Sequence, residues 1–377
     1  LLEPIRGLRI DLTANHRTTN NMSEYYLFDS NGFRGVFNTM ENGSFSMTYN
    51  VFKTSFKKVD KKGTFHSESF ERFLDNRQIV ADRLGQSRSG QTHPVGGTYQ
   101  DDPRAGLPYN PGGYPNLGLG VEKGSDGYGL SSQEVMIPSF LAAYSGKRAS
   151  DIFLNPMPSI ARMQPNWRVT YDGLSRVKWF QKYIRSFDVS HAYRSTYTVG
   201  NYLTNLDWNE FRDGFSFVRD AQGNFIPKYQ ISGVSISEQY TPLLQFNITW
   251  LNSLSTRAEY KRGRIINLSL NNNQIIENYN NEWIIGLGYR FDKMDIILGS
   301  REGQRKMSSD LNLRADISLR DNFSIIRRIE EGLNQMTSGQ RIVTLKLTGD
   351  YVLSDRFNMQ LFYDRSMNSP YISTTYP

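Results

Sequence analysis

The stretch DLNLRADISLR, residues 310–320, has an apolar side chain at every second position. Because consecutive side chains of a β-strand point to opposite faces, a strand here has one apolar face and one charged face. The apolar face holds Leu311, Leu313, Ala315, Ile317 and Leu319, and the other face holds Asp310, Asn312, Arg314, Asp316, Ser318 and Arg320. The stretch therefore predicts a two-faced strand.

The same alternation recurs along the chain. It is clearest in residues 8–14, 45–51, 187–199, 244–250, 266–270, 283–291, 343–353 and 357–363. We count about a dozen such strands, several of ten residues or longer, whereas strands of soluble sheets usually have five or six. A water-soluble β-sandwich also alternates, so the alternation by itself leaves both architectures open.

The position of the aromatic residues favours a membrane protein. Several of them lie near the ends of the apolar faces, as the interfacial girdles of a membrane barrel require: Trp250, Tyr260, Trp283, Tyr289, Phe291, Tyr351 and Tyr363. We therefore predict an all-β fold, an antiparallel transmembrane β-barrel.

Composition excludes several classes of site. The 377 residues include 22 Tyr and 22 Phe, and no Cys, which excludes disulfides, thiol nucleophiles and Cys-based metal sites. No apolar run is long enough for a transmembrane helix, while a mean hydropathy of −0.55 suits strands with one wetted face. The net charge is +7, and the Lys and Arg residues are scattered among Asp and Glu rather than gathered in a stripe. We therefore expect no nucleic-acid partner.

Residues 61–166 break the alternation and read as an insertion that folds as a lid. Residues 67–84 predict a helix capped by Ser67 and ended by Gly85, and residues 86–130 are rich in Gly, Pro and Tyr. A second helix is predicted to start at the capping box 131–134 and to end at Gly146, with Pro138 as a kink or restart.

Loop lengths give an orientation. If the short turn at Ser354 and Asp355 is periplasmic, the longer connections 200–227, 272–281 and 321–339 lie outside the cell, and so does the insertion.

Catalytic and metal-binding motifs have no support in the sequence. The four histidines are not spaced as metal ligands, and paired acids such as Asp101 and Asp102 in loops are usually solvated turn residues, although they could bind calcium. No nucleophile-elbow or Walker motif occurs. We expect no enzyme activity, no cofactor and no metal.

The charged faces are the candidate functional surface. A basic residue facing lipid at mid-bilayer costs about 2–4 kcal/mol, so these side chains must face water. The candidate lumen-lining residues are Asp310, Asn312, Arg314, Asp316 and Arg320, and the candidate lipid-facing residues are Leu287, Tyr289, Leu313, Leu345 and Leu361. They form either a conduit wall or the solvated inside of a plugged barrel.

Several segments resemble the C-terminal portion of the SprA/Sov family, the outer-membrane translocon of the type IX secretion system in Bacteroidota. They are LEPIRGL at 2–8, the helix 70–84 with FLDNRQ, IPSFLAAY at 137–144, PNWRVTYDGL at 165–174, and residues 309–322 and 349–365. The chain departs from a complete member because it stops at Pro377, before a final closing strand, and lacks most of the upstream chain.

The resemblance implies a segment of a very large single-chain barrel that exports folded cargo proteins bearing C-terminal signal domains. It also implies as partners a smaller outer-membrane barrel, a plug protein, a periplasmic chaperone or prolyl isomerase, and outer-membrane lipid. We expect barrel strands in 1–60 and 167–377, with 61–166 as a cap or gate. The alternatives are a porin or small-solute transporter, and a soluble β-rich adhesin.

Overall fold

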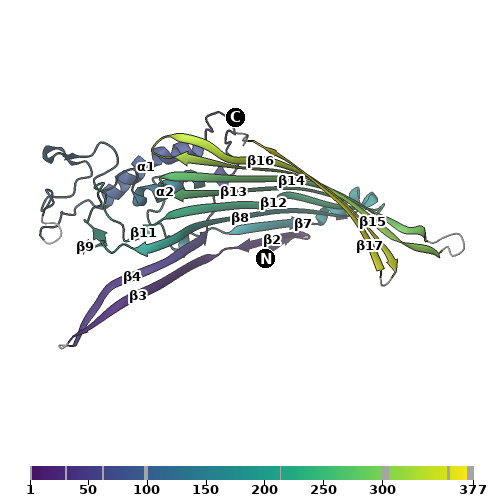
Figure 1. The fold of residues 1–377 in the computed structure, drawn as a ribbon, viewed down its shortest axis with the longest axis horizontal. Coiled ribbons are helices and arrows are strands. Elements are labelled where there is room, and N and C mark those ends of the chain that lie inside the picture. Colours follow the sequence, from purple (N-terminus) through teal and green to yellow (C-terminus); the bar gives the residue numbers. More distant parts are fainter. Residues whose placement is uncertain are drawn as a thin grey trace.

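The computed structural model describes residues 2–29, 32–61, 63–96, 101–212, 214–298, 305–354 and 357–371. These residues form one large antiparallel sheet with two α-helices (Figure 1). The strands of this sheet are β1 (Leu2–Ile5), β2 (Leu8–Thr13), β3 (His16–Asp29), β4 (Gly32–Thr48), β7 (Asn166–Tyr171), β8 (Ile184–Thr204), β11 (Tyr229–Ile231), β12 (Gly233–Trp250), β13 (Leu254–Ser269), β14 (Gln274–Leu298), β15 (Arg305–Arg328), β16 (Leu333–Ser354) and β17 (Phe357–Pro370).

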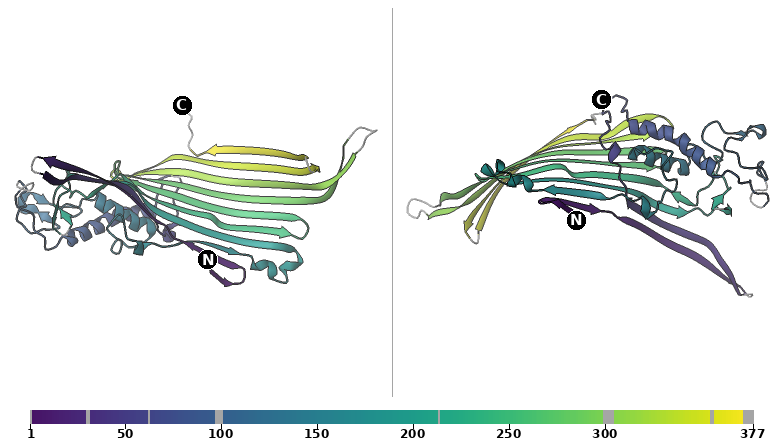
Figure 2. Two further views of the ribbon diagram at one scale, coloured as in Figure 1. Left: turned by 90° about the horizontal axis from the view of Figure 1, so that it is seen from below. Right: turned by 180° about the vertical axis from the view of Figure 1, so that it is seen from behind.

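The strands follow one another in the order β1-β2-β7-β8-β12-β13-β14-β15-β16-β17. From β12 onward each strand pairs with the next through a hairpin, and every pairing in the sheet is antiparallel. Strand β4 pairs with β8 beyond the end of β7, and the β3–β4 hairpin projects away from the body (Figures 1 and 2). The all-β prediction is confirmed as an antiparallel sheet, which is open within the described residues.

The segment between β4 and β7 carries both helices, α1 (Glu68–Ser87) and α2 (Gln133–Ser145). Two short hairpins complete the loops, β5 (Gly113–Tyr114) with β6 (Leu119–Gly120) and β9 (Glu210–Arg212) with β10 (Phe215–Ser216). Single turns of 3-10 helix occur at η1 (Phe52–Thr54), η3 (Pro115–Leu117), η4 (Ile160–Arg162), η5 (Gly173–Arg176) and η6 (Phe180–Lys182). We call residues 52–162 the helical block. Figure 2 shows it at one end of the strands.

The helix boundaries correct two predictions. Helix α1 runs through Gly85 to Ser87, and Gly85 serves close packing because a Cβ there would lie 2.9 Å from the Ser125 Cβ. Helix α2 has Ser132 as its N-cap, one residue after the start of the predicted box, and runs unbroken across Pro138. Gly146 ends α2 in the left-handed conformation, as predicted.

Two predicted connections are wrong, because 272–281 and 321–339 are largely strand. The true turns are 270–273, between β13 and β14, and 329–332, between β15 and β16. Alternate residues in these strand extensions, such as Ile275, Tyr279 and Phe323, are buried beneath neighbouring chain. The sequence suggested loops because the intervening residues are polar and Asn-rich.

The core lies between the helical block and one face of the sheet. Helix residues such as Phe73, Phe140 and Leu141 are buried in the same cluster as the strand residues Val234 and Ile266. This burial fixes the block to the sheet through the hydrophobic effect. Among the described residues, no helix combines the length and the apolar character needed to cross a membrane.

Candidate functional site

Strand register assigns every side chain of the sheet to one of two faces. Pairing is continuous between β13 and β14, and between β14 and β15 as far as Phe291, so alternate residues keep the same face over residues 274–291 of β14. Beside Ile275, Glu277 and Tyr279, which are buried against the helical block, the same face of β14 continues with Trp283 and Leu287. The helical block and the predicted lipid-facing residues therefore share one face, and the charged residues have the other.

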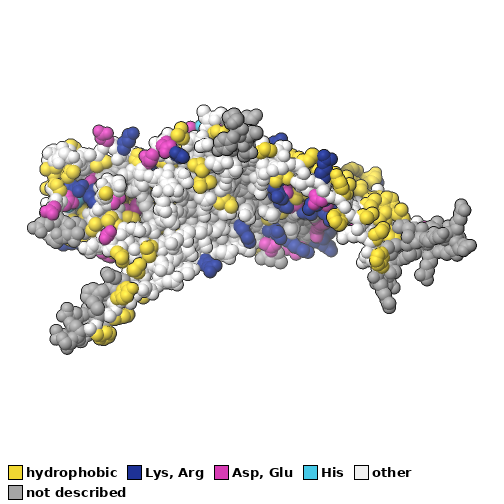
Figure 3. Space-filling model, viewed as in Figure 1, with side chains coloured by type: hydrophobic (Ala, Val, Ile, Leu, Met, Phe, Trp, Pro, Cys, Tyr) yellow, Lys and Arg dark blue, Asp and Glu magenta, His cyan; other side chains and the backbone are white. Residues whose placement is uncertain are grey.

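The charged face is a lattice of ion pairs within and between strands. Arg314 Nε lies 2.7 Å from Asp316 Oδ2 on β15, and Arg320 Nη2 lies 2.7 Å from Glu282 Oε1 on β14. Lys261 Nζ on β13 lies 3.7 Å from Glu282 Oε2. In Figure 3, acidic and basic side chains gather over the right half of the sheet.

A hollow of about 560 Å³ lies on this face. Its lining includes Arg257, Glu282, Arg314, Asp316, Arg320, Lys346 and Asp364, which come from β13 to β17. Gly286 leaves room for the Asp316 carboxylate, because a Cβ there would lie 2.4 Å from Asp316 Oδ1. Because acidic and basic side chains both line the hollow, it fits a hydrated surface better than a binding site selective for one ion.

The opposite face carries a continuous set of apolar residues, which we call the apolar band; most of them are exposed or half-buried, and Tyr351 is buried. On β14 to β17 it consists of Trp283, Ile285, Leu287, Tyr289, Phe291, Leu311, Leu313, Ala315, Ile317, Leu319, Val343, Leu345, Leu347, Gly349, Tyr351, Met359, Leu361, Tyr363 and Met367. Along β14 it covers about nine residues, and a tilted strand crosses the hydrocarbon of a bilayer with about 9–11. Arg365, between Tyr363 and Met367 on β17, lies on the same face and pairs with Leu345.

Aromatic rings mark both ends of the apolar band. At the end next to the helical block, Tyr260 stacks on Trp283 with ring centroids 4.2 Å apart, and Trp167 stacks on Tyr193 at 4.3 Å. At the other end, Tyr289 meets Phe291 edge-on at 4.6 Å. This arrangement matches the two aromatic girdles of a membrane-spanning sheet.

All ten predicted site residues are placed. Asp310, Asn312, Arg314, Asp316 and Arg320 share the charged face, and Leu287, Tyr289, Leu313, Leu345 and Leu361 share the apolar band. The roles assigned to the two sets, lining a lumen and facing lipid, stay predictions.

Sequence reasoning missed other members of the charged face. They are Arg257, Glu259 and Lys261 on β13, Glu282 on β14, and Lys346 and Asp364 on β16 and β17. The signal was the same alternation of charged with apolar positions. On β13 it was weaker, because Thr256 interrupts the apolar positions of that strand.

The helical block and the connection between β10 and β11 form a second group of charges, around the buried His93. Its Nδ1 lies 4.0 Å from Asp102 Oδ2, and its Nε2 lies 3.9 Å from Asp126 Oδ2. Both carboxylates are held by arginines, since Arg104 Nε lies 2.8 Å from Asp102 and Arg219 Nη2 lies 2.8 Å from Asp126. Arg104 thus pairs with Asp102, one of the two acids considered above as calcium ligands, and no described residues form a group of three metal-ligating side chains.

Burial lowers the pKa of His93 to about 4, and nearby Arg219 adds to this effect. The native block thus keeps His93 neutral where the unfolded chain, with an ordinary pKa of 6.5, binds a proton. Between pH 6.5 and pH 4 the unfolded state therefore binds more protons than the native state, so the folded block loses stability as the pH falls through this range. We expect a loss of about 2 kcal/mol between pH 7 and pH 5 from this group alone.

Glu134 opposes His93 in the same pH window. Burial raises the pKa of Glu134 from 4.5 to about 7, so the native state binds the extra proton and gains stability as the pH falls. With Glu134→Gln, the stability of the helical block should therefore fall by the full contribution of His93 as the pH is lowered from 7 to 5. With His93→Gln, only Glu134 remains, and the stability of the block should rise over the same range. Hydrogen exchange of α1 and α2 at pH 5 and pH 7 measures both, and pH profiles parallel to the unsubstituted chain would contradict the prediction.

No model of a known protein family matches the chain, and no curated protein matches it in sequence.

Proposed function

We propose that this chain is part of the wall of an outer-membrane β-barrel pore that conducts proteins, with the charged face towards the lumen and the apolar band towards lipid. The observation that carries the proposal is the pairing of an exposed apolar band with an ion-pair lattice on the opposite face of the same strands. An exposed apolar surface spanning several strands is costly in water, and it is stable in hydrocarbon.

The length and width of the sheet favour a wide barrel. The long strands β14 and β15 extend well past the apolar band, so the wall continues beyond the bilayer. Within the described residues β1 and β17 stand at opposite ends of the strand order and do not pair. An open sheet of this width would form an arc of a larger barrel, which fits a pore for folded proteins.

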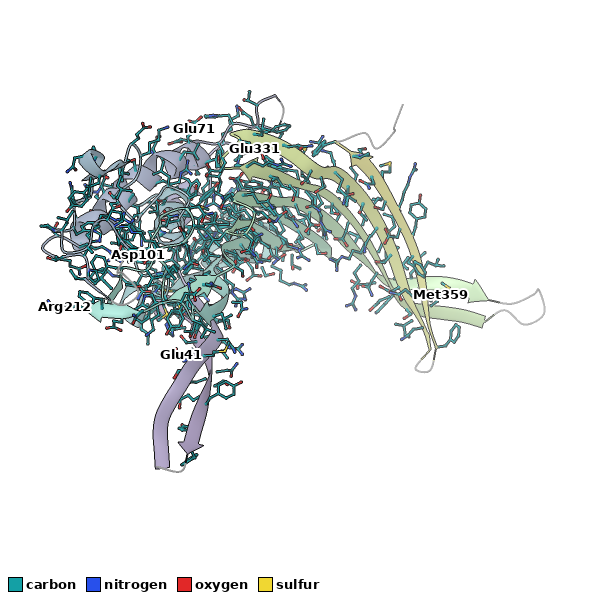
Figure 4. All side chains as sticks on the ribbon, turned by 60° about the vertical axis from the view of Figure 1, so that its left-hand side comes forward. Glu41, Glu71, Asp101, Arg212, Glu331 and Met359 are labelled. Atoms are coloured by element: carbon teal, nitrogen blue, oxygen red, sulfur yellow. The ribbon has the colours of Figure 1, made fainter. Side chains whose placement is uncertain are left out.

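The helical block stands beside the conduit rather than across it in this arrangement. It packs on the face of the apolar band, at the end of the strands opposite the β16–β17 hairpin. Figure 4 shows this separation: Glu331, between β15 and β16, lies near the helices, and Met359 on β17 lies at the far end. A gate formed by this block would have to act at the rim of the pore.

Secretion in a strain lacking the full-length parent protein tests the proposal. Cargo proteins with C-terminal signal domains should accumulate in the periplasm, and restoring the parent gene should restore their export. Periplasmic proteins without the signal serve as the control, since their location should not change. Unchanged export of signal-bearing cargo would refute a role in protein secretion.

A porin or small-solute transporter is the second candidate, because the same two-faced wall would serve it. Uptake of small solutes into the periplasm separates the two: a porin predicts slower uptake in the deletion strain with normal cargo export.

A soluble adhesin is the third candidate, and it predicts that the chain stays monomeric in water without detergent. Aggregation without detergent and recovery in micelles would count against that third class.

A further inference from the structure

The connection between β7 and β8 lies at the end of the sheet opposite the helical block. It contains the two short turns η5 and η6, and its Trp179 and Tyr183 side chains are 65% and 57% exposed. Large aromatic side chains exposed to this degree are unusual in a connection that only has to join two strands.

An aromatic chain links this connection to the apolar band. Trp179 contacts Phe180 with ring centroids 4.8 Å apart, and Phe180 contacts Phe187 at 5.9 Å. Phe187 in turn contacts Phe246, at 6.1 Å, on the apolar face of β12. The connection therefore lies on the same face as the apolar band, beside the aromatic girdle of Tyr289 and Phe291 at the end away from the helical block.

The same connection is basic. Residues 173–185 contain Arg176, Lys178, Lys182 and Arg185, and no Asp or Glu. Arg176 forms an ion pair with Asp172, at 3.2 Å. In the part of the chain that the structure describes, Lys178 and Lys182 form no ion pair, so their charge is available to an anionic partner.

We propose that residues 173–185 are an interfacial anchor that binds the phospholipid headgroups of the adjacent leaflet, with a preference for anionic lipid. The inference rests on the proposed membrane-wall function. Trp and Tyr rings prefer the boundary between acyl chains and headgroups, and lysines beside them attract lipid phosphates. A protein partner is disfavoured because the Trp179 and Tyr183 side chains continue the surface proposed to face lipid, and Lys178 and Lys182 lie beside them in the chain.

Fluorescence quenching by brominated lipids tests the anchor. The chain has five tryptophans, and single-Trp variants with the other four changed to Phe report on separate levels of the molecule. The probes are vesicles of phosphatidylcholine and phosphatidylglycerol with bromines at shallow or deep acyl positions. We expect Trp179 to be quenched at least about twofold more by shallow than by deep bromines, while Trp208, at the helical-block end, is not quenched.

Trp283, on the apolar band, separates the two proposals. If Trp283 is quenched and Trp179 behaves like Trp208, the anchor is refuted and the membrane wall stands. If neither Trp283 nor Trp179 is quenched, the membrane wall itself is refuted. Trp179→Phe in the otherwise unchanged chain guards against misfolding of the multiple variants, because it should reduce the fluorescence that shallow bromines quench and leave the contribution of Trp167 and Trp283 at the other girdle.

The charge preference has its own test. Replacing phosphatidylglycerol by phosphatidylcholine should lower the shallow quenching of Trp179, and Lys178→Gln with Lys182→Gln should abolish that dependence. Lys58→Gln with Lys123→Gln, two exposed lysines of the helical block, is the matched control and should keep it. Equal quenching in both lipids for the unsubstituted chain would overturn the preference for anionic lipid.

Discussion

Leu313→Arg should prevent most of the chain from assembling into a membrane, whereas Arg314→Leu, one residue further on, should not. Leu313 lies within the apolar band, where it pairs with Tyr289 and Gly349, and a charge there would face hydrocarbon. The expected loss of folding free energy in lipid is about 2–4 kcal/mol. Refolding into vesicles, followed by protease protection, measures it.

Arg314→Leu is a matched control because it changes the other face of the same strand. It removes an exposed ion pair with Asp316, which contributes about 0–1 kcal/mol. The comparison also separates a membrane wall from a soluble sheet, since Leu313 is 42% exposed. On a soluble surface its replacement by Arg should change stability by about 0.5 kcal/mol or less. Equal effects of the two substitutions would defeat the assignment of faces.

Alternation predicted the two faces because it depends on local geometry alone. In residues 310–320 it placed each side chain on the face where the structure has it. It could not predict what covers each part of a face, because that depends on chain far away in the sequence. Trp283 and Tyr279 have the same parity on β14, yet Trp283 is exposed and Tyr279 is buried by the helical block.

The buried ion pairs were invisible to the sequence for the same reason. Arg327 and Glu277 look like members of the charged lattice, but both are fully buried on the opposite face. Their partners come from remote chain: Arg327 Nη1 donates to the Phe65 carbonyl, and the Tyr144 hydroxyl donates to Glu277 Oε1. No pattern within β14 or β15 indicates that the insertion supplies these groups.

A similar pair, Arg264 with Glu238, anchors the loop before α1. Arg264 Nη1 donates to the Thr54 carbonyl at 3.1 Å, and Glu238 accepts from the Ser55 hydroxyl. Together the two pairs tie the helical block to the strand extensions by charge-assisted hydrogen bonds. They fix its position on the sheet more specifically than apolar burial alone.

Arg327→Met should release the helical block from the sheet. The substitution leaves the Glu277 carboxylate buried without its cation, and removing one partner of a buried pair costs about 3–5 kcal/mol. Hydrogen exchange of the amides in α1 and α2, with the chain in detergent micelles or lipid vesicles, should report this loss as faster opening. The apolar band is untouched, so membrane assembly itself should persist.

Two further variants decide whether the buried pair causes the effect. Arg327→Met with Glu277→Gln should recover much of the loss, because the neutral amide oxygen can still accept from the Tyr144 hydroxyl and no buried charge is left unpaired. Arg328→Met removes a neighbouring pair with Glu331 that is about half exposed, and it should cost about 1 kcal/mol or less. If Arg327→Met and Arg328→Met opened the helices equally, the block would be held by apolar packing and not by the pair.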